Sequence, residues 1–572
     1  MTNEQFLQQF GHFIDAPNGI KKLRELILQL AVRGKLLHQD PNHEPANELL
    51  KRIRAEQNRL MTQGRIKKAK HLLEISKEEI PFDLPQGWEW VRLGSLMEMF
   101  NGRAFKQSEW ADAGLPIIRI QNLNNYSAPF NYFAGNIEER HRVRPGDFLI
   151  SWSGTPGTSF GAFIWRKGQG ALNQHINKCV IFGSEIDRDY LKLSVNSCMG
   201  HLISRAQGGV GLKHVTKRTL ENIVFGLPPL KEQHRIVAKV DQLMALCDQL
   251  EAERNAREAT YQRLIRAFHH PLTAVGSDNN HNGIDGLPAW HRIRDNFADL
   301  YTTLESVQAL RQTILQLAVQ GKLVGQVVGD GDVNTLLTRI KKEQDEHVRM
   351  GSTKYYKYTK EDPEELGLPS IPEHWIWTYL AELLIFGPRN GYSPKSVDYK
   401  TGVKSLTLTA ITRGTFDPEQ FKYLDIDLEA DSYLWLRAGD ILMQRANSME
   451  YVGVSAIFNG NEGEFIYPDL IMKMRPSNEL SAKYLKLVLS SVYVRGYMRE
   501  RTTGTSGSMP KINQQVVNSI PVPLPPLAEQ NRIVAKVDEL MTLCDQLEAN
   551  IRNKSDIAAR YAEAIVQQIA AA

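Results

Sequence analysis

The sequence predicts an α+β protein in which two mixed α/β domains are separated by long antiparallel coiled-coil helices and related by a pseudo-two-fold axis. The first observation is a tandem repeat, because the segment 227–252 recurs at 524–549 with roughly 22 of its 26 positions matching. The second is the 3.5-residue spacing of apolar residues in these repeated segments, which is typical of coiled coils. The third is a set of short β-branched runs between them, bounded by Gly, Asn and Pro as strands are.

The composition is that of a soluble protein with several domains. The chain has 572 residues, of which 42% are hydrophobic and 23% are charged, so it carries enough apolar material for more than one core. Its 69 basic and 65 acidic residues leave a net charge of +4, which excludes a simple polycation. Four scattered cysteines, no secretory start and no long apolar run predict reduced thiols, a cytoplasmic location and no membrane span.

Two further pairs of segments recur in the same order and at nearly the same offset. Residues 23–36 match 310–323, and residues 47–57 match 334–344. The chain therefore contains two copies of one unit. The expected helices of the two copies are an opening helix (roughly 4–37 and 293–324), a charged helical stretch (46–79 and 333–366) and a long helix after each Leu-Pro-Pro-Leu segment.

The middle of each copy diverges strongly and is opened by a Pro-x-x-Trp signal, as at Trp88 and Trp375. The expected domains are an N-terminal helical region (1–83), a first middle domain (84–226), a central helical region (227–370, with a linker at about 271–292), a second middle domain (371–523) and a C-terminal helix (524–572). Expected strands include 115–123, 179–182 and 453–458, and expected helices include 190–197 and 484–491. The segment 276–286 is a run of turn formers and predicts an exposed connection.

The long helices carry a coiled-coil seam in which apolar residues alternate at spacings of four and three. The seam residues are Ile236, Val240, Leu243, Cys247 and Leu250 in the first helix and Ile533, Val537, Leu540, Cys544 and Leu547 in the second. Near-identical helices are expected to pair with each other in antiparallel fashion. That arrangement predicts that a helix of about 40 residues, about 60 Å long, holds the two different middle domains at a fixed separation.

No recognisable catalytic constellation is present in the sequence. There is no phosphate-binding G-x-x-x-x-G-K-[ST] loop, no H-E-x-x-H zinc motif and no Asn-Pro-Pro-aromatic tetrapeptide. His269 and His270 precede Pro271 and are interpreted as a helix end rather than a ligand pair. We therefore expect a binding protein with no catalytic residue, no metal and no cofactor of its own.

Both middle regions carry amide, hydroxyl and guanidinium side chains of the kind that read base edges, together with lysines suited to phosphates. The DNA-binding candidates of the first region are Arg103, Lys106, Arg119, Gln121, Asn122, Ser153, Thr155, Gln174, His175, Lys213, Lys217 and Arg218. Those of the second are Arg389, Tyr392, Lys395, Thr409, Arg413, Arg445, Asn447, Ser448, Thr505, Ser506, Lys511 and Asn513. The alternative for each residue is an ordinary surface loop. The basic runs 67–70 and 354–360 are interpreted as solvated faces rather than phosphate contacts.

The doubled Leu-Pro-Pro-Leu helices, the paired Leu-Gln-Leu-Ala-Val-x-Gly-Lys-Leu stretches and the Pro-x-x-Trp openings resemble type I restriction–modification specificity subunits over essentially the whole chain. The resemblance implies that each middle region is a target recognition domain for one half of a bipartite, asymmetric DNA sequence. It also implies that the helices dock two methyltransferase subunits, which restriction and translocase subunits then join. S-adenosylmethionine, ATP and Mg²⁺ would belong to those partners.

Two alternatives remain open at this point. One is the recognition subunit of another type of methyltransferase-nuclease, which the neighbouring reading frames would reveal. The other is a coiled-coil scaffold whose heads bind protein. The basic, amide-rich composition of both middle regions favours DNA over a protein partner.

Overall fold

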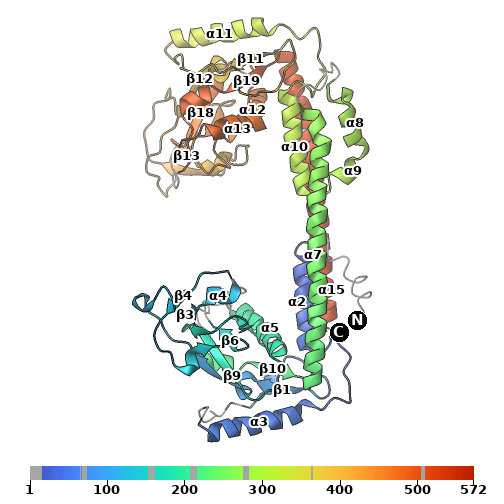
Figure 1. Cartoon of the computed structure of the whole chain (residues 1–572). Helices are drawn as coiled ribbons and strands as arrows, with labels where there is room; N and C mark the ends of the chain where they lie inside the picture. The colour runs from blue at the N-terminus through green and yellow to red at the C-terminus, as the bar shows by residue number, and fades with distance from the viewer. Residues whose placement is uncertain are drawn as a thin grey trace. The chain divides into compact units, whose positions relative to one another are not determined.

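The computed structural model describes residues 16–64, 66, 72, 74–125, 127–152, 161–206, 216–274, 283–362, 365–503 and 509–571. The chain forms two compact units (Figure 1). Unit 1 comprises residues 1–256 and 555–572, and unit 2 comprises residues 257–554. We refer to the strand-rich part of unit 1, residues 89–227, as head 1 and to its counterpart in unit 2, residues 376–524, as head 2.

The helices of unit 1 are α2 (Gly19–Val32), α3 (Ala46–Thr62), α4 (Ile120–Asn124), α5 (Arg188–Ala206), α6 (Lys217–Glu221), the first part of α7 (Leu230–Thr273) and the last part of α15 (Leu527–Ala571). Its strands are β1 (Glu89–Arg92), β2 (Met97–Asn101), β3 (Leu115–Ile118), β4 (Asn131–Phe133), β5 (Arg142–Val143), β6 (Phe148–Ser151), β7 (Gly161–Ile164), β8 (Gly170–Leu172), β9 (Ile176–Ile181) and β10 (Val224–Leu227). They form sheets in the orders β2-β9-β6-β7, β4-β3-β8-β5 and β1-β10.

Unit 2 repeats this plan. Its own helices are α8 (Pro288–Asp295), α9 (Phe297–Leu300), α10 (Leu304–Val319), α11 (Val333–Arg349), α12 (Ala482–Ser490), α13 (Val492–Glu500) and α14 (Gln514–Asn518). Its strands are β11 (Ile376–Tyr379), β12 (Leu384–Asn390), β13 (Val403–Leu406), β14 (Phe421–Leu424), β15 (Ile441–Gln444), β16 (Ser455–Ile457), β17 (Phe465–Ile466), β18 (Ile471–Pro476) and β19 (Pro521–Leu524). The sheet orders are β12-β18-β15-β16, β14-β13-β17 and β11-β19, and the predicted mixed α/β character of both heads is confirmed.

Two of the repeated sequence motifs meet in each unit. Gly34 ends the turn after α2 with φ +70°, and a Cβ atom at this position would lie 2.4 Å from Cγ of Pro85. Gly321 has φ +69° and the same 2.4 Å approach to Pro372. Only glycine fits a left-handed turn pressed this closely against another residue. The Gly-Lys-Leu stretch and the Pro-x-x-Trp opening are therefore repeated because they pack against each other.

The Leu-Pro-Pro-Leu segment joins each head to its long helix through a buried glutamine. Gln233 Nε2 donates to Pro228 O at 2.9 Å, and its Oε1 accepts from Asp187 N, just before α5, at 2.9 Å. In unit 2, Gln530 donates to Pro525 O at 2.9 Å and accepts from Ser481 N at 3.0 Å. Each glutamine thus fixes the first turn of its long helix (α7 or α15) to the start of a helix in the head (α5 or α12).

The sequence Arg-x-Gly-Asp occurs in both heads, at 144–147 and 437–440, and forms the same turn in each. Asp147 Oδ2 accepts from Arg144 N at 2.8 Å and lies 3.0 Å from Nζ of the buried Lys178 on β9. In head 2, Asp440 accepts from Arg437 N at 2.9 Å and lies 3.9 Å from Nζ of Lys473 on β18. Burial lowers the pKa of Lys473 to about 8. The turn and a buried lysine are thus retained together in both heads.

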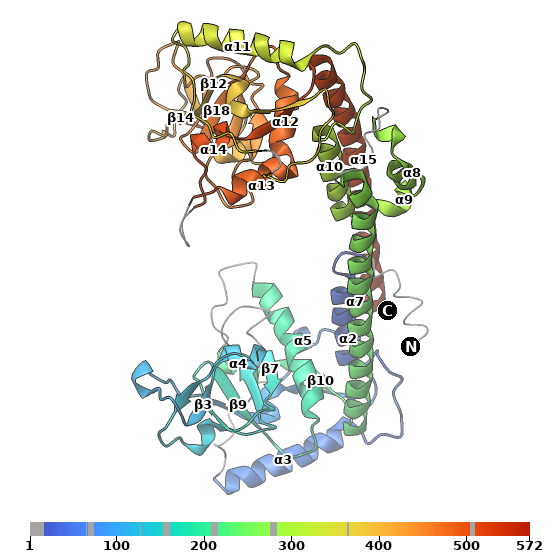
Figure 2. The same ribbon diagram turned by 45° about the horizontal axis from the view of Figure 1, so that its top comes forward.

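The long helices run antiparallel, as predicted. α7 begins in unit 1 and ends in unit 2, whereas α15 begins in unit 2 and ends in unit 1. In unit 1, α2 lies along α7 (Figures 1 and 2), and Arg24 of α2 forms ion pairs with Asp248 at 2.7 Å and Glu251 at 2.9 Å. In unit 2, Arg311 of α10 pairs in the same way with Asp545 of α15 at 2.5 Å.

The partner of each seam differs from the prediction. Four residues of each seam are buried, namely Ile236, Val240, Leu243 and Cys247 in unit 1 and Ile533, Val537, Leu540 and Cys544 in unit 2, while Leu250 and Leu547 are half-buried. The first set shares a hydrophobic cluster with α2 and with Ala562 of α15, and the second shares one with α10 and with Ile265 of α7. The opening helix of the same unit offers an apolar face to the seam, so the two seams lie in separate cores instead of pairing with each other.

Four expected segments also differ in the structure. Among the described residues of the stretches 46–79 and 333–366, the α-helices end at Thr62 and Arg349, and a short 3-10 helix follows at Lys77–Glu79. In the second stretch, Gly351 has φ +72°, which ends the helix. The expected helix 293–324 is divided into α8, α9 and α10, because Asn296 leaves helical geometry and Thr303 caps α10. The expected exposed connection is partly buried, since Ile284 is 2% exposed within the core of unit 2.

Candidate nucleic-acid interface

The strand ends of head 1 bring several candidate residues to one edge. β3 and β8 are parallel neighbours, with Ile118 opposite Leu172. Arg119 and Gln121 follow β3, and Gln174 and His175 follow β8. Because parallel strands finish at the same side of a sheet, these side chains lie along a common edge. We call this set of residues, together with Trp152 after β6, the edge of head 1. The ring centroids of Trp152 and His175 are 5.6 Å apart.

A repeated Asn-Gly pair places a further candidate at the edge of each head. Arg103 N donates to Leu172 O at 2.8 Å, and Tyr392 N donates to Tyr467 O at 3.0 Å. A Cβ atom on Gly102 would lie 2.0 Å from Asn173 O, and one on Gly391 would lie 1.9 Å from Tyr467 O. Glycine is therefore required where the chain crosses the end of the neighbouring strand. This Asn-Gly signal is present in both copies of the sequence but did not enter the prediction.

Arg119 is held at the edge of head 1 by an aromatic ring and a side-chain amide. Its guanidinium lies 5.5 Å from the ring centroid of Trp110, which is 40% exposed. Its Nη2 donates to Asn131 Oδ1 at 3.2 Å. Stacking on an aromatic ring and a side-chain hydrogen bond restrict a guanidinium to few orientations, which favours recognition of a planar, two-acceptor edge. Trp110 and Asn131 lie 9 and 12 residues from Arg119 and were not predicted as site residues.

Three side chains after β8 leave buried polar atoms without a hydrogen-bond partner in the described part of the chain. These atoms are Gln174 Oε1, His175 Nδ1 and Asn177 Oδ1. An unsatisfied buried polar atom costs about 1–3 kcal/mol, so it needs a physical explanation. A ligand that approaches this edge with hydrogen-bonding groups supplies one.

Head 2 presents a different set of side chains at the corresponding edge. Thr409, exposed after β13, donates to Gln420 Oε1 at 2.9 Å, and Arg413 is exposed four residues later. The segment after β15 pairs with the segment that carries Lys511, since Ile512 N donates to Arg445 O at 2.9 Å and Ala446 bridges Lys511. Ser448 is exposed and Asn447 Nδ2 donates to Gln444 Oε1 at 2.7 Å.

Other candidates in head 2 lie around these segments. Arg389 is exposed, and its guanidinium lies 3.4 Å from the ring centroid of Tyr433. Tyr392 is 52% exposed and Lys395 is exposed. Asn513 is exposed but its Oδ1 accepts from Val516 N at 2.8 Å and caps α14. The guanidinium of Arg389 thus stacks on an aromatic ring, as that of Arg119 does in head 1, but it is carried by a different element.

Asn122 is a correction to the predicted site. It is fully buried, its Oδ1 accepts from Arg119 N at 3.0 Å, and its Nδ2 donates to Ala128 O at 3.2 Å. Both atoms of the Asn122 amide form hydrogen bonds within the turn that starts α4. The side chain therefore supports Arg119 and does not face solvent. Arg103 also has protein partners, because it pairs with Glu109 and lies 4.7 Å from the ring centroid of Phe133.

The remaining candidates divide into three groups. Lys106 and Gln121 are exposed in head 1. Lys217 and Arg218 lie on α6 rather than at the edge, and Lys217 Nζ donates to Met99 O at 2.6 Å. Ser153, Thr155, Lys213, Thr505 and Ser506 lie outside the described residues.

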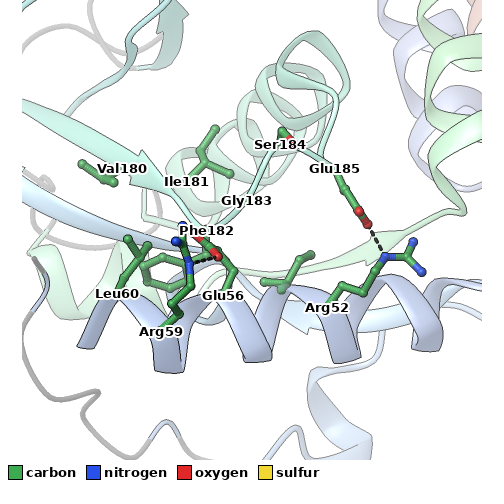
Figure 3. Close-up of a pocket in the computed structure, with 11 residues that line it drawn as sticks. Arg52, Glu56, Arg59, Leu60, Val180, Ile181, Phe182, Gly183, Ser184 and Glu185 are labelled. Carbon is green, nitrogen blue, oxygen red and sulfur yellow. Dashed lines mark hydrogen bonds and ion pairs between the residues drawn. The ribbon is translucent and has the colours of Figure 1, made fainter. Parts of the chain in front are cut away.

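The pocket between α3 and the end of β9 is a separate feature (Figure 3). It has a volume of about 590 Å³ and includes Arg52, Arg59 and Glu185 in its lining. Arg52 pairs with Glu185, and Arg59 pairs with Glu56 at 2.7 Å. In unit 2 the residue equivalent to Glu56, Glu343, accepts from Asn478 N at 3.0 Å and bonds the corresponding turn directly. The pocket thus replaces a packing contact that is closed in unit 2, and none of the candidate residues is part of its lining.

The described residues carry neither a metal-binding cluster nor a membrane-spanning helix. They contain no group of three His, Cys, Asp or Glu side chains arranged to hold a metal ion. None of their helices combines the length and the apolar character needed to cross a membrane.

Comparison with known proteins identifies the family. The family model for the type I restriction modification DNA specificity domain matches residues 85–257 and 394–554. The EcoEI type I restriction enzyme specificity subunit of Escherichia coli is 32% identical over 570 residues, covering 96% of this chain and 93% of the relative. The EcoAI specificity subunit of Escherichia coli is 33% identical over 567 residues, with the same two coverages.

A solved structure described as the basis of complex assembly and conformational transition of the type I R-M system covers 86% of this chain and 99% of its own, at 18% identity and a TM-score of 0.47. The matches of the family model fall once in each unit, and the two E. coli relatives cover nearly the whole chain. The chain belongs to the family of type I restriction–modification DNA specificity subunits, with two recognition domains.

Proposed function

We propose that this chain reads a bipartite, asymmetric double-stranded DNA target, with head 1 bound to one half-site and head 2 to the other. The observation that carries the proposal is that the two heads share one fold but differ in the side chains at the same edge. Gln121 and Thr409 occupy equivalent places after β3 and β13, and Arg103 and Tyr392 do so after the Asn-Gly pairs. Different groups on equivalent positions select different bases.

The proposal assigns no catalytic step to this chain. Two methyltransferase subunits dock on the helical parts, and restriction and translocase subunits join through them. S-adenosylmethionine, ATP and Mg²⁺ are bound by those partners. In support, Leu264 of α7 and Tyr561 of α15 hold equivalent positions of the two repeated helices and are 46% and 54% exposed. A large apolar side chain exposed at two equivalent places suits a partner present in two copies.

Exchange of residues 84–226 for the corresponding region of a relative with a different target tests this function. Sequencing of methylated adenines in host DNA should show one half-site changed and the other unchanged. A change of both half-sites, or of neither, would contradict the assignment of one half-site to each head. A second candidate function, a scaffold that binds only protein, predicts no target sequence in either the parent or the exchanged chain.

A further inference from the structure

A basic segment follows α11 in unit 2. Residues 347–360 include Arg349, Lys354, Lys357 and Lys360 and contain no Asp or Glu. After the helix ends at Gly351, residues 353–362 form no regular secondary structure. We call residues 354–362 the strap. The sequence predicts only a solvated face for the basic run 354–360 and does not predict its hydrogen bonds to the rest of unit 2.

The second half of the strap, residues 358–361, is bonded to head 2. Tyr358 donates to Glu382, and Thr359 N donates to Ser519 Oγ at 2.8 Å. Glu361 accepts from Tyr379 OH through its backbone oxygen at 2.5 Å and from Arg501 Nη2 through its carboxylate at 2.6 Å. Hydrogen bonds to several separate elements hold an irregular segment in one path.

The outward side of the strap is cationic and aromatic. Lys354 and Lys357 are exposed, and Tyr355 is 61% exposed while its hydroxyl donates to Asp345 at 2.6 Å. Lys354 Nζ lies 5.8 Å from the ring centroid of Tyr356. Residues three apart in a chain are separated by at most about 10 Å, so the two lysines place two positive charges close together.

The strap adjoins the candidate interface of head 2. Gln515 Nε2 of α14 donates to Thr359 Oγ1 at 3.4 Å, and α14 is capped by the candidate Asn513. Arg501, the partner of Glu361, is two residues from Thr503, whose N donates to Lys511 O at 2.8 Å. The lysines of the strap and Lys511 are therefore carried by segments that are directly bonded to each other.

We propose that Lys354 and Lys357 bind the sugar–phosphate backbone of duplex DNA beside the half-site read by head 2. This inference rests on the proposed DNA-binding function of head 2. Lysine side chains neutralise phosphates without reading bases. The strap therefore adds affinity and fixes the position of head 2 along the duplex, but it does not select the base sequence. Two exposed lysines three residues apart suit the negative charge of a nucleic-acid backbone better than an apolar partner surface.

The test compares the full chain, in complex with its methyltransferase subunits, with the variant K354Q/K357Q. Binding to a target duplex and to a duplex with both half-sites scrambled is measured between 50 and 200 mM salt, roughly the range over which phosphate contacts dominate affinity. Removal of two phosphate contacts should reduce the slope of log K against log salt by about 1.8, equally on both duplexes. Protection of backbone positions flanking one half-site should also be lost.

Two matched variants complete the design. K354R/K357R keeps the charges and should keep the parental slope, whereas K341Q/K342Q removes two exposed lysines from α11 and should also leave the slope unchanged. A parental slope in K354Q/K357Q overturns the strap proposal, as does loss of methyltransferase assembly with an unchanged slope, which would reassign the strap to the protein partner. If the parental complex itself does not prefer its target over the scrambled duplex, the proposed function fails as well.

Discussion

The buried carboxylate of Glu529 lies 2.8 Å from Nε2 of His374, and its counterpart Glu232 lies 3.3 Å from Nδ1 of a different histidine, His43. Glu232 and Glu529 are 1% and 0% exposed and precede the glutamines that join each head to its long helix. His374 comes from the Pro-x-x-Trp turn, whereas His43 comes from the segment before α3. The two copies thus keep the acid and supply its histidine partner from separate places, and Glu232 also pairs with Arg235 at 2.7 Å. This indicates that the buried acid needs polar partners.

This relationship predicts coupling between acid and histidine within each unit. His374→Ala should lower the free energy of unfolding by about 1–2 kcal/mol, because it leaves a buried carboxylate less well paired. In the double variant H374A/E529Q the loss should be smaller than the sum of the single losses, with a coupling of at least about 0.5 kcal/mol by chemical denaturation. The mixed pair H374A/E232Q serves as control, since its members lie in different units and should be additive. Additivity in both pairs would contradict the coupling.

Arg119 should determine one base of one half-site. Arg119→Lys keeps the charge but removes the planar fork held by Trp110 and Asn131, so discrimination at a single base pair should weaken by about 1–3 kcal/mol. Competition binding with single-base variants of the target measures this loss. Arg218→Lys, on α6 and away from the edge, should leave every preference unchanged. Equal weakening on all sequences would instead make Arg119 a phosphate contact.

The fold was largely predictable because the tandem repeat and the spacing of apolar residues can be recognised directly in the sequence. A seam of Ile236, Val240 and Leu243 shows that one face of α7 is buried, but the same pattern suits any apolar partner. The choice of α2 as that partner depends on tertiary packing, which periodicity does not specify. The end of α11 was missed although Gly351 is an ordinary helix stop signal.

The candidate site was predictable by residue type but not by orientation. Gln121 and Asn122 are adjacent amides, yet Gln121 is exposed and Asn122 is fully buried in the turn that starts α4. Their difference arises from the hydrogen bonds of that turn. Trp110 and Asn131 contact Arg119 only after the sheet forms, so no short motif connects these three residues. The separation of the two heads remains a prediction.

The exposed pair Leu264 and Tyr561 should carry the docking of partner subunits. Leu264→Glu and Tyr561→Glu each place a charge on an exposed apolar position of α7 or α15, so each should remove one of two methyltransferase subunits, and the double variant should remove both. Light scattering of the purified complexes gives the stoichiometry. Arg263→Glu and Arg560→Glu change exposed neighbours on the same helices and should leave it unchanged. Full assembly of the double variant would place the docking surface elsewhere.

His269 predicts how the stability of unit 2 depends on pH. It is buried, and its ring nitrogens lie 2.7 Å from Tyr301 Oη and 2.9 Å from Thr313 Oγ1. Burial lowers its pKa to about 4, from 6.5 for an ordinary histidine. Between these values the unfolded chain binds more protons than the folded chain. The contribution of His269 is therefore constant above pH 6.5 and is lost progressively as the pH falls from 6.5 to 4.

Chemical denaturation at pH 7 and pH 5 tests this dependence. Between these two pH values the parental chain should lose about 2 kcal/mol of unfolding free energy through His269. His269→Gln should remove this part of the pH dependence, because glutamine does not titrate, although the variant starts from a lower stability at pH 7. His270→Gln changes an exposed neighbour and should retain the parental difference between the two pH values. If H269Q loses as much stability on acidification as the parental chain does, the acid sensitivity of unit 2 arises from other groups.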